Sequence, residues 1–121
     1  MAKILIIEDE KVLNEMYTMK FEMSWYEVIE AFDWQEWLDL AKAHKPDVIL
    51  LDIMMPWLNW HETLEILKKE SDWPVKILMF SNLSDKQNID EALKKWADWY
   101  ILKADTTPKQ AVEKVNEVLN K

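Results

Sequence analysis

The stretch Val48-Ile49-Leu50-Leu51-Asp52-Ile53-Met54-Met55-Pro56 decides the fold. Its short apolar run contains β-branched residues, which predicts a strand buried on both faces. Asp52 follows the run, where such a strand leaves the core. In an open α/β sheet, ligands bind at this carboxyl end of the strands. Taken alone, Asp52 is equally well explained as an aspartate that ends a strand or caps a helix.

Composition limits the class of protein. A chain of 121 residues, 50% apolar and 31% charged, suits one globular domain over residues 1–121. The absence of cysteine excludes disulfides and thiolate metal sites. A net charge of −8, with no arginine, argues against direct binding of nucleic acid. No apolar run is long enough to span a membrane or to form a signal peptide, so we expect a cytoplasmic protein with no membrane partner.

Strand and helix patterns alternate along the whole chain. The expected strands are Lys3–Ile7, Tyr26–Ala31 at an edge, Asp47–Leu51, Val75–Phe80 and Trp99–Leu102. Helices are expected after each strand, four of them behind the cap-like tetrads that begin at Asp33, Asn59, Ser84 and Thr107. This alternation predicts a doubly wound α/β fold, (βα)5, with a parallel sheet covered by helices on both faces.

Apolar residues recur at helical spacing in the first expected helix, at Val12, Met16, Met19 and Met23, with Leu13 and Tyr17 beside them. We therefore expect them on its buried face. The methionines in general are interpreted as filling the core.

Polar residues stand at the ends of the expected strands: Glu8 and Asp9, Asp52, Ser81 and Lys103. Because these ends share one edge of the sheet, the five side chains are expected to converge. Three crowded carboxylates repel one another, and a bound divalent cation would relieve that repulsion. Oxygen ligands without Cys or His indicate Mg²⁺, with Mn²⁺ as its usual substitute. With a hydroxyl and an ammonium group nearby, the set is typical of a phosphoryl-binding pocket.

From about Lys3 to Leu119, this pattern resembles the receiver domain of response regulators. In this family an acidic pair follows the first strand and an aspartate follows the third. A Ser or Thr follows the fourth strand, and a lysine follows the fifth. The resemblance implies a five-stranded parallel sheet in the flavodoxin-like order 2-1-3-4-5. It also implies transfer of a phosphoryl group from a histidine kinase or phosphotransfer protein to Asp52.

The resemblance assigns further roles. Asp9 would ligate Mg²⁺ directly, Glu8 would act beside it partly through water, and the backbone carbonyl of Met54 would complete the site. Ser81 and Lys103 would contact the phosphoryl group, and Tyr100 would turn inward as Ser81 moves toward it. The face of the fourth helix, fifth strand and fifth helix would bind the downstream target. Such a protein is not an enzyme beyond phosphorylation and dephosphorylation of its own aspartate.

One departure from the family concerns the residue after Lys103. It is Ala104, where the family usually has proline, often after a cis peptide bond. A cis bond before a non-proline residue costs about 2.5–4 kcal/mol. The loop after the fifth strand is therefore expected to differ from the family's usual form.

Two other classes with this topology are rejected. A flavodoxin-type flavin binder needs a phosphate loop after the first strand, and Glu8-Asp9-Glu10 would repel that phosphate. A dehalogenase-type phosphatase needs a second aspartate where this chain has Met54. A receiver that docks without phosphorylation remains open, and labelling of Asp52 would distinguish the two. We expect a stand-alone protein, the alternative being that an output domain was removed from a longer one.

Glycine is absent, whereas roughly 8 residues are expected in an average chain of this length, and tryptophan occurs 8 times. The tryptophans fall where receiver-like sequences commonly carry glycine or another small turn residue: Trp25, Trp34, Trp37, Trp57, Trp60, Trp73, Trp96 and Trp99. Deliberate replacement, or UGA glycine codons translated as tryptophan, would explain this. In either case, a protein with these tryptophans would be functionally impaired, and we expect strained turns at Trp60 and Trp96.

Overall fold

The computed structural model describes residues 2–32, 34–52, 59–81, 86–95, 97–102 and 106–120. Strands and helices alternate in chain order, as follows: β1 Lys3–Ile7, α1 Lys11–Met23, β2 Glu27–Ala31, α2 Trp34–His44, β3 Val48–Asp52, α3 Trp60–Glu70, β4 Lys76–Ser81, α4 Lys86–Lys95, β5 Trp99–Leu102 and α5 Pro108–Leu119. The strands form one parallel sheet in the order β2-β1-β3-β4-β5, which confirms the predicted fold. No helix in these ranges combines the length and apolar character that a membrane crossing requires.

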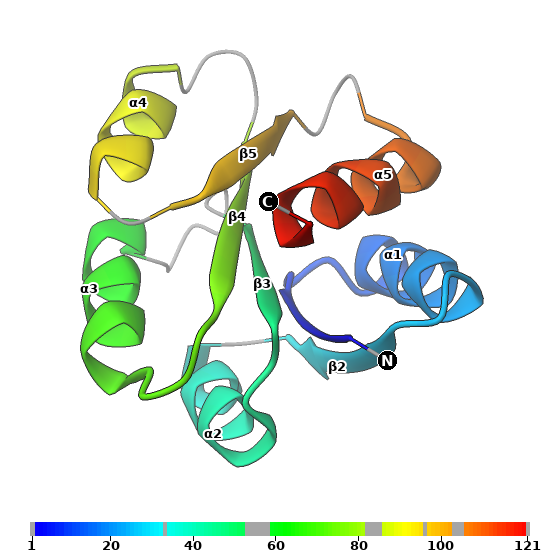
Figure 1. Cartoon of the computed structure of the whole chain (residues 1–121), viewed down its shortest axis with the longest axis horizontal. Coiled ribbons are helices and arrows are strands. Elements are labelled where there is room, and N and C mark those ends of the chain that lie inside the picture. Colours follow the sequence, from blue (N-terminus) through cyan, green and yellow to red (C-terminus); the bar gives the residue numbers. More distant parts are fainter. Residues whose placement is uncertain are drawn as a thin grey trace.

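Helices cover the sheet on both faces, with α1 and α5 on one side and α2, α3 and α4 on the other (Figure 1). Alternate residues of the central strands serve the two layers. Leu50 packs with the α1 and α5 side, and Leu51 packs with the α2 and α3 side. All five residues of β3 are buried, as the apolar run predicted.

The prediction for the buried face of α1 is wrong for its main stripe, although Leu13 and Tyr17 beside that stripe do pack into the core. Val12, Met16, Met19 and Met23 are exposed, at 49–68% of their surface. The helix instead packs through Tyr17 and Phe21, with the polar side chains of Asn14 and Thr18 also buried. The two aromatic rings bury large apolar surfaces, and the two polar groups bond to each other. The interpretation of the methionines as core residues therefore fails for α1, although Met79 of β4 is fully buried.

Two of the predicted helix caps are confirmed. The side chain of Asn59 accepts a hydrogen bond from the Glu62 backbone at the start of α3. At the start of α5, Thr107 and Gln110 form the complete reciprocal capping box. The cap residues Asp33 and Ser84 lie outside the described residues.

Strain at Trp60 was also predicted, and this is wrong. Trp60 is the first residue of α3, directly behind its cap, and positive φ angles among the described residues occur at Trp25 and Lys45. Trp96, the other position expected to be strained, lies outside the described ranges.

Glu30 of β2 lies close enough to two carboxylates of α1 to be affected by their charges. Burial raises the pKa of Glu30, and the negative charges of Glu15 and Glu22 raise it further. A carboxyl whose pKa is higher in the folded than in the unfolded state lowers the free energy of unfolding once it ionises. Its unfavourable contribution therefore appears as pH rises through the unfolded and then the folded pKa.

Replacing Glu30 with Gln should accordingly increase the free energy of unfolding near neutral pH. The increase should disappear in acid, below the unfolded carboxyl pKa, where the wild-type side chain is also neutral. Urea unfolding at a series of pH values measures this difference. A gain of equal size at all pH values would mean that the charge of Glu30 is not its cause.

Candidate phosphoacceptor site

The strand register brings the polar strand ends to one edge of the sheet. Ile7 pairs with Leu51, so Glu8 and Asp52 each lie one residue beyond that pair. Asp52 pairs with Phe80, which places Ser81 one residue further along β4. Ser81 in turn pairs with Leu102, the last residue of β5. The backbone therefore brings the ends of β1, β3 and β4 to one edge of the sheet.

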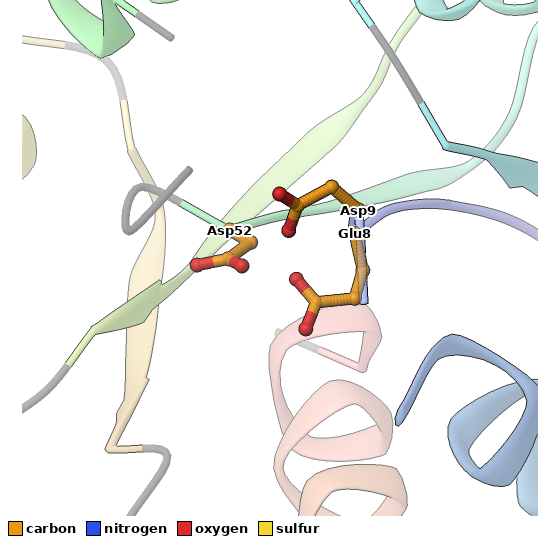
Figure 2. A group of neighbouring side chains, drawn as sticks. All are labelled: Glu8, Asp9 and Asp52. Atoms are coloured by element: carbon orange, nitrogen blue, oxygen red, sulfur yellow. The ribbon is translucent and has the colours of Figure 1, made fainter. Parts of the chain in front are cut away.

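Three carboxylates meet at this edge. Figure 2 shows Glu8 and Asp9, from the end of β1, and Asp52, from the end of β3, pointing toward one another. One carboxylate oxygen from each residue lies within 4.8 Å of those of the other two. Glu8 and Asp52 are buried, whereas Asp9 is exposed. The cluster is therefore open to solvent on the Asp9 side and closed beneath it.

The arrangement fits a hard divalent cation. Two ionised carboxylates no more than 4.8 Å apart repel by roughly 3 kcal/mol or more at an effective dielectric constant of about 20. Two of these three groups are also shielded from water, so solvent screens them poorly. Carboxylate oxygens are the ligands that Mg²⁺ takes in proteins, and Mg²⁺ commonly keeps several waters of its own. Because Asp9 is exposed, solvent water reaches the cluster from that side.

The other predicted site residues are described to different extents. The backbone of Ser81 ends β4, as predicted. Met54 and Lys103 lie outside the described residues, as does Ala104 with its loop. Tyr100 is half-buried in β5, with its ring stacked on Trp99 at a centroid distance of 5.3 Å.

One polar residue near the site was missed in the sequence. Asn14 is completely buried in α1, and its side-chain amide donates to the carbonyl oxygen of Glu8 at 3.0 Å. Asparagine inside a helical pattern is usually exposed, so the apolar periodicity gave no reason to select it. The sequence did hold one signal for Asn14. This residue stands five residues after Asp9, in the first turns of the helix that leaves the site.

The family follows from a comparison with protein-family models. The model described as the response regulator receiver domain matches residues 4–116. The chain belongs to this family. Receiver domains are the phosphoacceptor modules of two-component signalling, so the fold and general function implied by the strand-end pattern are confirmed.

Curated relatives are transcriptional regulators. The chain is 35% identical over 119 residues to a probable transcriptional regulator ycf27 of Porphyridium aerugineum. It is 34% identical over 119 residues to the phosphate regulon transcriptional regulatory protein PhoB of Pseudomonas aeruginosa. Each alignment covers 98% of this chain but only 48% and 52% of the respective relative. The chain therefore spans about half the length of these regulators.

Solved receiver domains have the same fold. The receiver domain of the Francisella response regulator 1452 superposes with a TM-score of 0.86 at 30% identity, covering 99% of this chain and 98% of that one. A CheY-like receiver domain protein from Methanospirillum hungatei superposes with a TM-score of 0.88 at 28% identity, covering 99% and 94%. Both superpositions extend over nearly the whole of each chain.

Proposed function

We propose that Asp52 is the phosphoacceptor of this receiver domain and that phosphorylation requires a divalent cation held by Glu8, Asp9 and Asp52. The observation that supports the proposal is the convergence of three carboxylates at the carboxyl edge of the sheet. The donor would be a histidine kinase or a phosphotransfer protein. The cation would be Mg²⁺, or Mn²⁺ in its place.

In the proposed reaction, a carboxylate oxygen of Asp52 attacks phosphorus of a phosphohistidine. A P–O bond forms, the P–N bond breaks, and the departing imidazole nitrogen keeps the bonding electron pair. Bound Mg²⁺ would neutralise the negative charge that gathers as the phosphoryl group meets the carboxylates. Glu8 and Asp9 would hold the cation beside Asp52, and the Met54 carbonyl would complete its ligands. Ser81 and Lys103 would bond the phosphoryl oxygens after transfer.

The proposed output is a change at the surface of α4, β5 and α5. Tyr100 lies in β5 at the wall of a hollow that is also lined by Gln110 and Lys114 of α5. The ammonium of Lys114 lies 5.4 Å from the ring centroid of Trp99, so the wall combines aromatic and charged groups. In this proposal, Tyr100 turns inward on phosphorylation and alters the surface offered to a downstream target.

The proposed role is that of a cytoplasmic relay or docking protein. The only reactions it would carry out are phosphorylation and dephosphorylation of its own aspartate. The curated relatives are named as transcriptional regulators, and about half of their length has no counterpart in this chain. We therefore assign no DNA contact to these residues.

Acetyl phosphate or phosphoramidate, added with and without MgCl₂, tests the proposal. Intact mass should rise by one phosphoryl group only when the cation is present, and a chelator should prevent the rise. Fragmentation should place the group on Asp52. Labelling that is indifferent to chelator, or that maps to another residue, would contradict the proposal. A stable fold that takes no label would favour a receiver that docks without phosphorylation.

The phosphoryl group is expected to be lost slowly. In the family, the residues two positions after the aspartate and two after the Ser or Thr flank the path of the attacking water. Here they are Met54 and Leu83, whose apolar side chains cannot hold a water in line. Met54→Asn should shorten the lifetime of the label, measured by intact mass against time after donor removal. Faster loss from the wild type than from this variant would refute the argument.

A further inference from the structure

Asn14 fixes the peptide group that joins the two acidic residues of the site. The backbone N–H of Glu8 donates to the carbonyl of Ala31 at 3.1 Å, which continues the pairing of β1 with β2. The carbonyl of Glu8 accepts from Nδ2 of Asn14 at 3.0 Å. Because this carbonyl belongs to the peptide bond between Glu8 and Asp9, its direction sets where the Asp9 backbone and side chain begin.

The orientation of the Asn14 amide is itself determined. The hydroxyl of Thr18, one turn further along α1, donates to Oδ1 of Asn14 at 3.2 Å. Nδ2 faces the carbonyls of Glu8 and, at a longer 3.5 Å, Ala31. A flipped amide would direct its oxygen at two carbonyl oxygens, which repel it. Asn14 is completely buried and Thr18 nearly so, so water cannot substitute for these bonds.

A restraint of this kind matters because the three carboxylates repel one another when no cation is bound. The loop between β1 and α1 has three residues, and it carries two of the three carboxylates of the cluster. Repulsion within the cluster favours any movement of this loop that separates Asp9 from Asp52. We infer that Asn14, oriented by Thr18, is a positioning residue that holds Glu8 and Asp9 in place for the cation. This inference rests on the metal site proposed above.

The inference predicts weaker Mg²⁺ binding when the amide is removed. Asn14→Leu has a similar volume but no donor, so the Glu8 carbonyl loses its partner. Groups that orient metal ligands typically contribute 10–100-fold to affinity, and we expect a rise in Kd of about tenfold. Thr18→Val removes only the bond that orients the amide and leaves the donor in place, so we expect a smaller rise in Kd of about threefold, below the 10–100-fold range of groups that bond to the ligands directly. The Kd is measured by MgCl₂ titration of ¹⁵N-labelled protein, following the amide signals of Asp9 and Asp52.

Val115→Ala is the matched control. Val115 of α5 is buried in the same cluster as Tyr17 and Phe21 but does not touch the site, so its truncation lowers stability without moving the loop. The inference is supported if Asn14→Leu and Thr18→Val raise Kd and Val115→Ala does not. It is overturned if Asn14→Leu binds Mg²⁺ like the wild type, or if Val115→Ala weakens binding equally. If Asn14→Leu does not fold, an unchanged Kd for Thr18→Val overturns it. Failure of the wild type to bind Mg²⁺ would instead refute the metal site itself.

A second, independent observation concerns the turn after α1. Tyr26 N–H donates to the Phe21 carbonyl at 3.0 Å, and Trp25 N–H donates to the Glu22 carbonyl at 3.1 Å. These two bonds define a Schellman motif, whose penultimate residue adopts the left-handed conformation and is usually glycine. The accompanying apolar contact is present, because the rings of Phe21 and Tyr26 meet edge-on at 5.2 Å. The residue in the glycine position is Trp25, with φ of 71° and 81% of its surface exposed.

A bulky, exposed indole is an unfavourable choice for this position, and the chain contains no glycine at all. A second tryptophan is also anomalous: Trp37 is buried, and its indole N–H has no acceptor among the described residues. We propose that position 25, and the other tryptophan positions with it, is glycine in the natural protein, encoded by UGA. The abundance of lysine and the absence of arginine fit an AT-rich gene.

The gene sequence and the mass of the natural protein test this proposal. Eight UGA codons, with an intact mass from the source organism that matches glycine at all eight positions, are the expected result. UGG codons at these positions, or the mass and 280 nm absorbance of eight tryptophans, would overturn it.

Discussion

Replacing Asp52 with Asn is expected to abolish phosphoryl uptake from acetyl phosphate while increasing the stability of the metal-free protein. A carboxamide is not a nucleophile toward phosphorus, so label should fall to background. The same change removes one of three carboxylates that lie within 4.8 Å of one another, two of them buried. Relief of that repulsion is expected to raise the free energy of unfolding by about 1–3 kcal/mol. Intact mass reads the first effect, and urea unfolding in EDTA reads the second.

Asp47→Asn is the matched control. Asp47 directly precedes the same strand at its opposite end, where its side chain accepts a hydrogen bond from the Lys3 backbone at 2.8 Å. It carries the same charge but lies far from the acidic cluster, so phosphoryl uptake should be unchanged. Mg²⁺ should stabilise this variant as it does the wild type, and should stabilise Asp52→Asn much less. Equal label on Asp52→Asn and the wild type would refute Asp52 as acceptor.

The sequence predicted the fold because its local patterns agree with one another. The run that ends at Asp52 is a strand buried over its full length, and the caps at Asn59 and Thr107 mark helix starts that the structure confirms. The carboxylate cluster was predictable for the same reason. Parallel strands end at one edge, so polar residues placed after each strand are brought together without any knowledge of side-chain contacts.

The buried face of α1 could not be predicted in the same way. Apolar periodicity selects residues that are individually hydrophobic, and it chose a stripe containing Met16 and Met19 that remains exposed. The buried stripe contains Asn14 and Thr18, which enter the core only because each completes hydrogen bonds there. Whether a polar residue finds such partners depends on backbone groups from β1 and β2, which no pattern within α1 contains.

Replacing Trp25 with Gly is expected to increase the free energy of unfolding by about 1 kcal/mol. A non-glycine residue in the left-handed region costs about 1–2 kcal/mol, and glycine offsets part of that gain through its greater freedom in the unfolded chain. Trp25 is 81% exposed, so little packing is lost when the indole is removed. For a domain of this size, the gain corresponds to a rise in Tm of about 4 °C. Thermal and urea unfolding both measure it.

Two variants separate the backbone effect from loss of the indole. Trp25→Ala removes the indole but keeps a Cβ in the left-handed conformation, so its stability should stay close to that of the wild type. Lys45→Gly relieves the other positive φ found among the described residues, 47° just after α2, and should also be stabilising. If Trp25→Ala gained as much as Trp25→Gly, the exposed indole rather than the backbone would be the source of instability. If Trp25→Gly lost stability, the indole would contribute packing that outweighs the cost of its left-handed backbone.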